Sequence, residues 1–373
     1  MRNEEIEGLK IVHIIPSLNS GGAEAMLYKL LKNQASPNNS IEIVTLLSAG
    51  FYADQIRKMK YPVHELNLKT ARNPFKVFLQ LVKVFRKADI IQSWMYHSDL
   101  IAFVLGKLML RKKVIWGIRR SYLDKEYMRV GTYYTAKICA YLSKYVDGII
   151  SCTFVGKKNH EKFGYKNHNF IVISNGFDLE EFDECSNMKK TNKLLRLLNV
   201  ARWEPLKDHR TLFAAAHDLK EKGFQYELLL VGSGMDKNNE SLLEMICEYN
   251  IGNEVKLLGV RKDIPDLMRS SDIYISSSLS EGFPNVIGEA MASGLFCVAT
   301  NAGDTKYIID GFGAVVSIKD PIKLAEGIIR AIRMDKNDLR DIKHQARKRI
   351  EEEFSIQHIA KQYETMYQKI GNK

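Results

Sequence analysis

The stretch Ser278 to Thr300, SLSEGFPNVIGEAMASGLFCVAT, constrains the fold more than any other part of the chain. It places a Gly-Phe-Pro turn and a helical pattern between two β-rich runs, DIYISSS before it and FCVAT at its end. Short β-rich runs on either side of a helix are typical of parallel strands joined by a crossover. Pro284 suits the first helical turn, and Gly294 suits the left-handed position just after the helix.

The same stretch carries two carboxylates, Glu281 and Glu289, which lie eight positions apart on either side of the turn. The backbone N–H groups of residues 283–286 would point out of the carboxyl edge of the sheet. A helix N-terminus at that edge favours anions. The stretch therefore predicts a site that holds phosphates.

Strands alternate with helices along the rest of the chain, which predicts an α/β fold of doubly wound parallel sheets. Because 373 residues are many for one core, we expect two domains, residues 1–176 and residues 177–354. The polar run from Ile173 to Lys193 is the predicted linker. We expect the charged helical segment at the end, about residues 355–373, to pack back on the first domain. The predicted strands are KIVHIIP, IEIVTLL, ADIIQSW, KVIWGIR, DGIISC, LLRLLNVAR, YELLLVGSG, VKLLGV, DIYISSS and FCVAT.

Charge is unevenly distributed between the two halves. Residues 1–176 hold 27 Lys and Arg and 13 Asp and Glu, a net charge of +14, whereas residues 177–373 hold 28 and 31, a net charge of −3. A basic half indicates nucleic acid, an anionic membrane surface or an anionic substrate as partner. Compact nucleic-acid-binding motifs and interleaved stacking aromatics are absent from the sequence, so nucleic acid is not expected.

The segment Pro74 to Lys87, PFKVFLQLVKVFRK, adds to this positive charge. It is either an interfacial helix on a membrane or a core-facing helix with a solvated basic side, and periodicity slightly favours the second. Near one helical face it places Phe75, Phe78, Leu79, Val82 and Phe85.

Several classes of protein are disfavoured. The polar, acidic first residues are unlike a signal peptide, and no apolar run approaches the roughly 18 to 20 residues that span a bilayer, so we expect a cytoplasmic protein. Five cysteines without CxxC or Cys/His spacing favour buried free thiols over disulfides or zinc. They are Cys139, Cys152, Cys185, Cys247 and Cys297.

Several motifs, in the right order over nearly the whole chain, resemble the retaining nucleotide-sugar glycosyltransferases of family 4. They are GGAE, WMYHSDL, WGIRRS, ISNGFD, NVARWEPLKD, LLVGSG, LLGVRKDIPDLM and EGFPNVIGE. The resemblance implies the GT-B fold, with two Rossmann-like domains facing across a cleft, the first binding the acceptor and the second the nucleotide sugar. WMYHSDL and WGIR are similar to the branch that builds polysaccharides and O-antigens.

A donor site in the second domain follows from this resemblance. Arg202 and Lys207 match the family's diphosphate ligands, and fixed positive charge there stabilises the leaving β-phosphate in the transition state. Glu289 matches the carboxylate that binds the ribose, and Glu281 matches the one that reaches the donor sugar. A surface ion pair is the alternative for Arg202, and solvated carboxylates are the alternatives for the two glutamates. The other expected donor contacts are Gly232, Val260, Arg261, Phe283, Pro284, Asn285 and Val286.

The first domain would complete the site. His97 matches the family's donor-sugar histidine, although a lone histidine is more often structural. Gly21 and Gly22 would let the backbone approach the donor, unless they form a plain glycine turn. Arg119 and Arg120 are candidate acceptor contacts.

The predicted reaction moves a sugar from a nucleotide-diphosphate donor, UDP rather than GDP, to a hydroxyl of a polyprenyl-diphosphate-linked or other lipid-linked glycan. The resemblance implies retention by a front-face mechanism, in which the leaving β-phosphate takes the acceptor proton. Without a DxD-like motif at a strand end, neither metal nor cofactor is expected. The enzyme would work at the inner, anionic face of the cell membrane. A UDP-sugar 2-epimerase and a noncatalytic nucleotide-sugar or membrane-binding protein are the rival functions.

Overall fold

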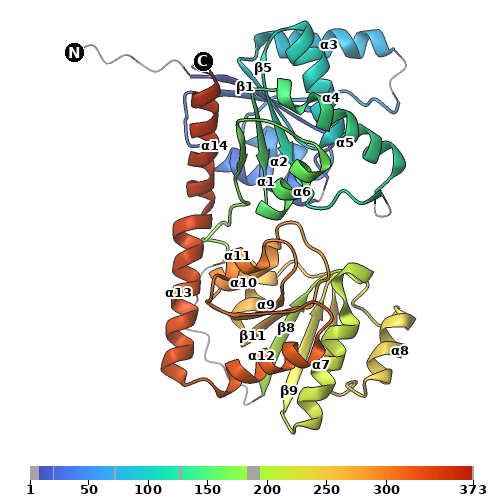
Figure 1. Cartoon of the computed structure of the whole chain (residues 1–373), viewed down its shortest axis with the longest axis vertical. Helices are drawn as coiled ribbons and strands as arrows, with labels where there is room; N and C mark the ends of the chain where they lie inside the picture. Colours follow the sequence, from blue (N-terminus) through green and yellow to red (C-terminus); the bar gives the residue numbers. More distant parts are fainter. Residues whose placement is uncertain (1–7, 20, 71–72, 126–127, 183–193, 372–373) are drawn as a thin grey trace, which may run out of the picture. The chain divides into compact units, whose positions relative to one another are not determined.

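The computed structural model describes residues 8–19, 21–70, 73–125, 128–182 and 194–371. Contacts within the chain divide it into two compact units, residues 1–176 with 356–373 and residues 177–355. Figure 1 traces the elements of both units.

The first unit is built on a seven-stranded parallel sheet with the order β3-β2-β1-β4-β5-β6-β7. Its strands are β1 Lys10–Ile15, β2 Ser40–Thr45, β3 Val63–Glu65, β4 Ile90–Ser93, β5 Lys113–Ile118, β6 Gly148–Ser151 and β7 Phe170–Val172. Its helices are α1 Gly22–Lys32, α2 Ala53–Lys58, α3 Pro74–Lys87, α4 Tyr96–Ile101, the π-helix η1 Ala102–Met109, α5 Val130–Leu142, the 3-10 helix η3 Ser143–Tyr145, α6 Phe154–Phe163 and α14 Ile356–Gly371.

Helices cover both faces of this sheet, as expected for a parallel sheet with two buried faces. One apolar cluster joins the sheet to α3, α4, η1 and α5. The other joins it to α1, α2 and the C-terminal helix α14. In Figure 1, α14 accordingly lies on one side of this unit, and α3 and α5 lie on the other.

The second unit has a six-stranded parallel sheet with the order β10-β9-β8-β11-β12-β13. Its strands are β8 Leu195–Val200, β9 Tyr226–Val231, β10 Val255–Gly259, β11 Ile273–Ser276, β12 Phe296–Thr300 and β13 Ala314–Val316. Its helices are the 3-10 helix η4 Pro205–Lys207, α7 His209–Glu221, α8 Glu240–Glu248, α9 Ile264–Arg269, α10 Asn285–Ala292, α11 Thr305–Ile309, α12 Pro321–Arg333 and α13 Lys336–Phe354.

Helix α10 forms between β11 and β12, as predicted, and it packs tightly on a buried phenylalanine. Pro284, predicted in the first helical turn, is the N-cap immediately before it, and Gly294 has the predicted left-handed φ of 73°. A Cβ atom on Gly288 would lie 2.1 Å from the Phe177 ring. That ring is buried beside Phe283 and Phe354, so it has little room to move away from an added methyl group.

The ten predicted strands are confirmed, whereas three further strands were not named from sequence. The three are β3, β7 and β13, which are only three residues long and lie at the edges of their sheets. Helix α14 covers most of the predicted C-terminal segment, residues 355–373, and Ser355 separates it from α13. Residues 183–193 of the predicted linker lie outside the described residues.

The prediction of buried thiols is correct for three cysteines and wrong for one. Cys139, Cys152 and Cys297 are buried, whereas Cys247 on α8 is exposed. Cys185 lies outside the described residues.

Helix α3 combines the two alternatives weighed for it. Its core face consists of Leu81, Val84 and Phe85. Phe75 and Leu79, which were placed near the same face as Phe85, are exposed. One side of the helix therefore packs on the sheet and another presents apolar and basic side chains to solvent.

The turn that joins β4 to α4, the helix that carries His97, lies beside the buried carboxyl group of Asp99. Met95 has a φ of 71°, unusual for a residue other than glycine, and its N–H donates to the Gly117 carbonyl at 3.0 Å. The Ser93 hydroxyl donates to Asp99 at 2.6 Å. Burial raises the pKa of Asp99 to about 7.

Replacing Gly288 with alanine should destabilise the second unit. The new methyl group would overlap the Phe177 ring, and overpacking of this kind costs about 1–3 kcal/mol. Gly131→Ala on α5 is the matched control, because no atom lies within 4 Å of its added Cβ. Calorimetry should find a lower Tm for Gly288→Ala and an unchanged or slightly higher Tm for Gly131→Ala. Equal melting of the two variants would contradict the packing of α10.

Asp99→Asn should change how stability depends on pH. The folded-state pKa of Asp99 is about 7, above its ordinary value of 3.8, so the folded protein holds a proton that the unfolded chain has released. Asp99 therefore destabilises the fold increasingly as pH rises through this window. Relative to wild type, the variant should gain about 2–3 kcal/mol between pH 5 and pH 8.

Thermal melts of both proteins across that range measure the effect. The exposed Asp124→Asn is the control, and its difference from wild type should not vary with pH. A difference between Asp99→Asn and wild type that stays constant or falls with pH would show that Asp99 is not a buried carboxyl group.

Candidate donor-binding site

The candidate site of the second unit lies where the strand order reverses. Strands β8 and β11 are neighbours in the sheet, although the chain leaves them in opposite directions along it. In parallel α/β sheets, ligands bind outside the carboxyl ends of the strands at such a switch point. Arg202 follows β8 and Glu281 follows β11, so the topology brings both residues to this edge.

A cavity of about 330 Å³ opens at this position. Seven of the residues predicted to contact the donor line it, together with five others. The lining residues are Val200, Ala201, Arg202, Lys207, Tyr274, Ser276, Ser278, Glu281, Phe283, Pro284, Asn285 and Val286. Because Pro284 is the N-cap of α10, the N-terminus of that helix contributes to the wall.

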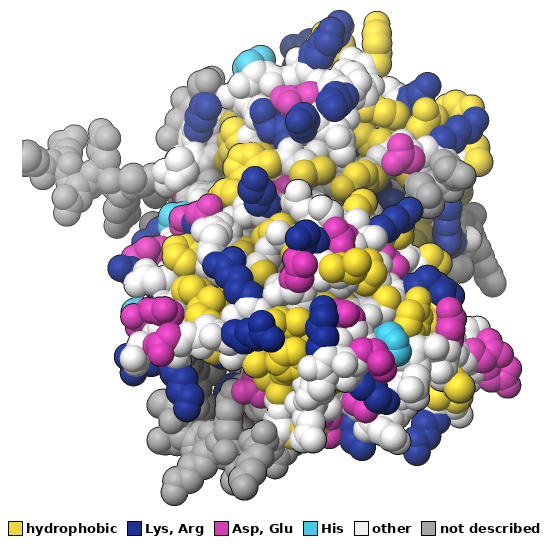
Figure 2. Space-filling model, turned by 60° about the horizontal axis from the view of Figure 1, so that its bottom comes forward, with side chains coloured by type: hydrophobic (Ala, Val, Ile, Leu, Met, Phe, Trp, Pro, Cys, Tyr) yellow, Lys and Arg dark blue, Asp and Glu magenta, His cyan; other side chains and the backbone are white. Residues whose placement is uncertain are grey.

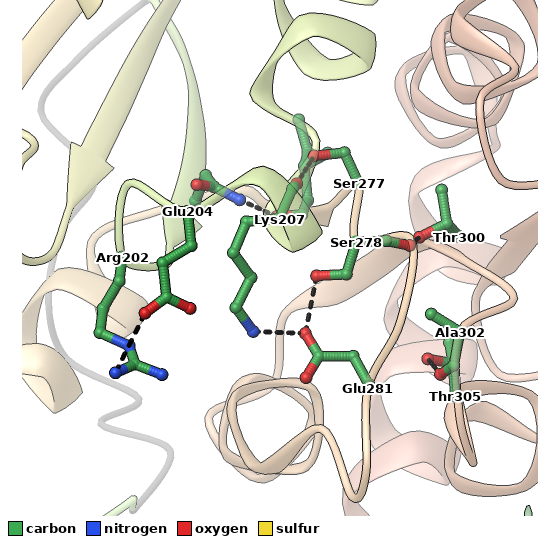
Figure 3. Close-up of polar contacts among 11 residues, drawn as sticks. Arg202, Glu204, Lys207, Ser277, Ser278, Glu281, Thr300, Ala302 and Thr305 are labelled. Carbon is green, nitrogen blue, oxygen red and sulfur yellow. Dashed lines mark hydrogen bonds and ion pairs between the residues drawn. The ribbon is translucent and has the colours of Figure 1, made fainter. Parts of the chain in front are cut away.

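Lys207 and Glu281 form an ion pair in the cavity wall, with 2.5 Å between Nζ and Oε1 (Figure 3). Their side chains are only 22% and 16% exposed. The Ser278 hydroxyl donates to the same carboxylate oxygen at 2.6 Å. Removing either charged partner would leave the other charge half-buried and uncompensated, which is costly.

Two hydrogen bonds to backbone carbonyl groups of η4 hold this pair in place. The Ser277 hydroxyl donates to the Lys207 carbonyl at 2.8 Å, and the N–H of Leu279 donates to the Leu206 carbonyl at 2.8 Å. These bonds attach the 3-10 helix η4 to the segment that follows β11, so that Lys207 and Glu281 are positioned as a unit.

Arg202 is more exposed than Lys207 and forms an ion pair with Glu204 at 3.2 Å. This contact is the surface ion pair considered as an alternative for Arg202. Exposed pairs contribute about 0–1 kcal/mol, so an anion could displace Glu204 at little cost. Arg202 and Lys207 line the same cavity, and Figure 3 shows both ion pairs.

Five residues of the cavity wall were missed from sequence: Val200, Ala201, Tyr274, Ser276 and Ser278. The last three alternate along β11 and just beyond it, so they share one side of the strand. Burial, followed by the negative charge of Glu281, raises the pKa of Tyr274 well above its usual range. The period-two pattern of DIYISSS was the available sequence signal.

The remaining predicted donor residues of the second unit lie outside this cavity wall. Gly232 follows β9 with a φ of 141°, and a Cβ there would meet the Ala201 carbonyl at 2.0 Å. Val260 and Arg261 follow β10 and are exposed, and Arg261 binds Asp263 at 2.8 Å. Glu289 lies one turn into α10 and is half-buried.

In the first unit, the predicted residues gather at the carboxyl edge of its sheet. Gly21 and Gly22 begin α1 after β1, and His97 is the exposed second residue of α4, after β4. Strands β1 and β4 are neighbours at the point where the strand order of this sheet reverses. Topology thus gives these loops the same kind of position as Arg202 and Glu281 have in the second unit.

Arg119 and Arg120 follow β5 at the same edge but differ in their surroundings. The Arg119 guanidinium lies 4.1 Å from the centre of the Trp94 ring and donates to Asn175 at 3.0 Å. It also donates to the hydroxyl of Tyr363 on α14. Arg119 therefore ties the end of β5 to the C-terminal helix, whereas Arg120 is exposed.

Within the described ranges, no three His, Cys, Asp or Glu side chains come together as metal ligands do. No helix in the part of the chain that the structure describes has the length and apolar character needed to cross a membrane.

Comparison with known proteins identifies both units. Residues 20–181 match the family described as Glycosyltransferase Family 4, and residues 182–349 match the family described as Glycosyl transferases group 1. The crystal structure of Anabaena HepE in complex with UDP superposes with a TM-score of 0.84 at 20% identity, covering 97% of this chain and all of that chain. This similarity establishes the GT-B fold.

Two curated relatives span most of the chain. The putative glycosyltransferase EpsF of Bacillus subtilis is 26% identical over 86% of this chain and 87% of its own. A Campylobacter jejuni enzyme is 25% identical over 95% of this chain and 98% of its own. It is named N,N'-diacetylbacillosaminyl-diphospho-undecaprenol alpha-1,3-N-acetylgalactosaminyltransferase. The chain belongs to glycosyltransferase family 4 and is an enzyme that uses nucleotide sugars.

Proposed function

We propose that the enzyme transfers a sugar, with retention of anomeric configuration, from a UDP-sugar to a hydroxyl of a lipid-diphosphate-linked glycan during cell-surface polysaccharide synthesis. The observation that carries this proposal is the cavity at the β8–β11 switch point. It combines Arg202, Lys207 and Glu281 with the N-terminus of α10.

The diphosphate of the donor fits the positive part of this cavity. Arg202 and Lys207 supply fixed charge, and the first turn of α10 adds the positive end of its dipole. When the anomeric C–O bond breaks, negative charge grows on the β-phosphate. These groups therefore stabilise the transition state more than the bound donor.

The Lys207–Glu281 pair suggests how the donor engages the site. A diphosphate that binds Lys207 competes with Glu281 for the ammonium group, and Glu281 then becomes available to the donor sugar's hydroxyls. Ser278 still donates to Glu281, so the carboxylate keeps one partner in either state. Glu289, one turn into α10, takes the ribose hydroxyls in this scheme.

The proposal also assigns roles to residues of the first unit. His97 binds the donor sugar or stabilises the oxocarbenium-like centre, and Gly21 and Gly22 allow close approach of the backbone. The leaving β-phosphate accepts the proton of the acceptor hydroxyl, so no separate base is assigned. Among the acceptor candidates, the exposed Arg120 is the better placed, because Arg119 already binds Trp94, Asn175 and Tyr363.

Two relatives support the choice of substrates. HepE was crystallised with UDP, and the Campylobacter jejuni enzyme is named for a diphospho-undecaprenol-linked acceptor. With an acceptor of that kind, we propose that the enzyme works at the inner, anionic face of the cell membrane, in the cytoplasm.

The two rival functions predict different experimental results. A UDP-sugar 2-epimerase would convert the donor without any acceptor, so an epimerised sugar after incubation with donor alone would favour it. A noncatalytic binding protein would bind the donor and never release nucleoside diphosphate. The charged set of Arg202, Lys207 and Glu281 favours transfer over both.

Donor binding should be visible as a rise in Tm. In a panel of UDP-, GDP- and ADP-sugars, a UDP-sugar should stabilise the wild type most, because only bound ligand shifts the folding equilibrium. Glu289→Ala should abolish most of this shift, and the exposed Glu244→Ala on α8 should retain it. The donor site is refuted if no nucleotide sugar stabilises the wild type or if Glu289→Ala responds as the wild type does.

Turnover should depend on both cations of the cavity. Deleting a preorganised charge typically slows turnover about 100-fold or more, so Arg202→Ala and Lys207→Ala should each lose at least that in kcat. Release of nucleoside diphosphate in the presence of a lipid extract containing the acceptor measures the rate. Arg210→Ala, which breaks an exposed pair with Glu248, is the control and should keep near wild-type turnover. Losses of only a few fold in the first two variants would remove them from the catalytic machinery.

A further inference from the structure

One face of the first unit gathers apolar side chains that its core does not use. We call it the basic aromatic face and define it as the outward side of α3, η1, α5 and η3. These four helices make up about a tenth of the chain. They carry ten of the twenty large hydrophobic side chains that are exposed among the described residues. The ten are Phe75, Leu79, Val104, Leu108, Met109, Val130, Tyr134, Ile138, Tyr141 and Tyr145.

The centre of this face is an apolar stripe along α5 and η3, which we call the α5 stripe. Val130, Tyr134, Ile138, Tyr141 and Tyr145 follow one another at intervals of three or four residues, which places them on one side of a helix. They are 49% to 71% exposed. The opposite side of α5 packs on the sheet through Ala136, Cys139 and Ala140. The core is therefore complete without the stripe.

The charged residues within the four helices all have the same sign. Not one Asp or Glu occurs within the four helices, whereas six Lys and Arg lie on α3, η1 and α5 and one on η3. Lys137 lies over the Tyr133 ring at 5.3 Å, and Lys144 lies over the Tyr145 ring at 4.9 Å. Lys107 is partly neutralised by Asp147 at 2.7 Å.

Other parts of the surface carry charges of both signs. Helix α13 interleaves acidic and basic residues and pairs them along its length, as in Arg347 with Glu351 and Lys348 with Glu352. Figure 2 shows a face on which Lys and Arg side chains lie among Asp and Glu side chains. Mixed charge suits a solvated surface, whereas uniform positive charge beside exposed aromatics requires another explanation.

We propose that the basic aromatic face docks the enzyme on an anionic lipid bilayer, with the α5 stripe at the interface. Tyrosine suits this position, because its ring is apolar and its hydroxyl reaches water. Lysines beside the rings keep their stems on apolar surface and reach anionic headgroups. This inference rests on the proposed function, which requires a lipid-linked acceptor, and it names the surface that would meet the membrane.

Vesicle flotation tests this proposal with the full chain. The wild type should float with vesicles of phosphatidylcholine and phosphatidylglycerol at low salt, and weakly with phosphatidylcholine alone. Lys137→Gln with Lys144→Gln should reduce partitioning about fivefold for each lysine, roughly 30-fold for the pair. Ile138→Ser with Tyr141→Ser should reduce it about tenfold or more, because the apolar contact is lost.

Matched variants of the second unit control for charge and hydrophobicity. Lys237→Gln with Lys336→Gln removes two exposed lysines, and Leu243→Ser with Ile322→Ser removes two exposed apolar side chains. Both should float as the wild type does. Absence of wild-type flotation, no preference for anionic lipid, or equal losses in the controls would overturn the proposal.

A second measurement separates this proposal from the proposed function and from self-association. The stripe variants should keep the wild-type Tm and the donor-induced rise in Tm. Donor stabilisation without flotation would reject the docking face alone, and flotation without donor stabilisation would reject the donor site alone. A wild type that sediments as a dimer, does not float, and becomes monomeric when the stripe is changed would assign the face to a second copy instead.

Discussion

Parallel pairing of the strands that the structure describes is the constraint on which both units depend. It collects the carboxyl ends of all strands at one edge of each sheet, and the strand order reverses between β1 and β4 and between β8 and β11. Loops at a reversal diverge from each other, so a cavity can open there without breaking the sheet. His97, Arg202 and Glu281 all follow strands that flank a reversal.

Within the second unit, the Lys207–Glu281 pair allows the site both to fold stably and to bind a diphosphate. A cavity that must hold a diphosphate needs positive charge that is partly withdrawn from water, and such charge is costly when it stands alone. Glu281 compensates Lys207, and Ser278 gives Glu281 a second partner. The site is thus stable in the absence of a ligand and still offers an ammonium group for which a phosphate can compete.

Different helices cover the two faces of the sheet in the first unit. On one face, α14 returns from the end of the chain and is held through Tyr363, which accepts a hydrogen bond from Arg119. On the other face lie α3, η1 and α5 with their exposed apolar and basic side chains. The exposed apolar and basic side chains of α3, η1 and α5 therefore lie on the opposite face of the sheet from α14.

The sequence by itself determined the α/β alternation, the ten central strands and the positions of Arg202 and Glu281 at strand ends, because these depend on local periodicity and turns. Edge strands of three residues carried too weak a pattern. Only the tertiary structure decided that Lys207 binds Glu281 across 74 positions, that Arg119 binds Tyr363 across 244, and that the α5 stripe faces outward. Contacts between distant segments depend on packing, which no local pattern specifies.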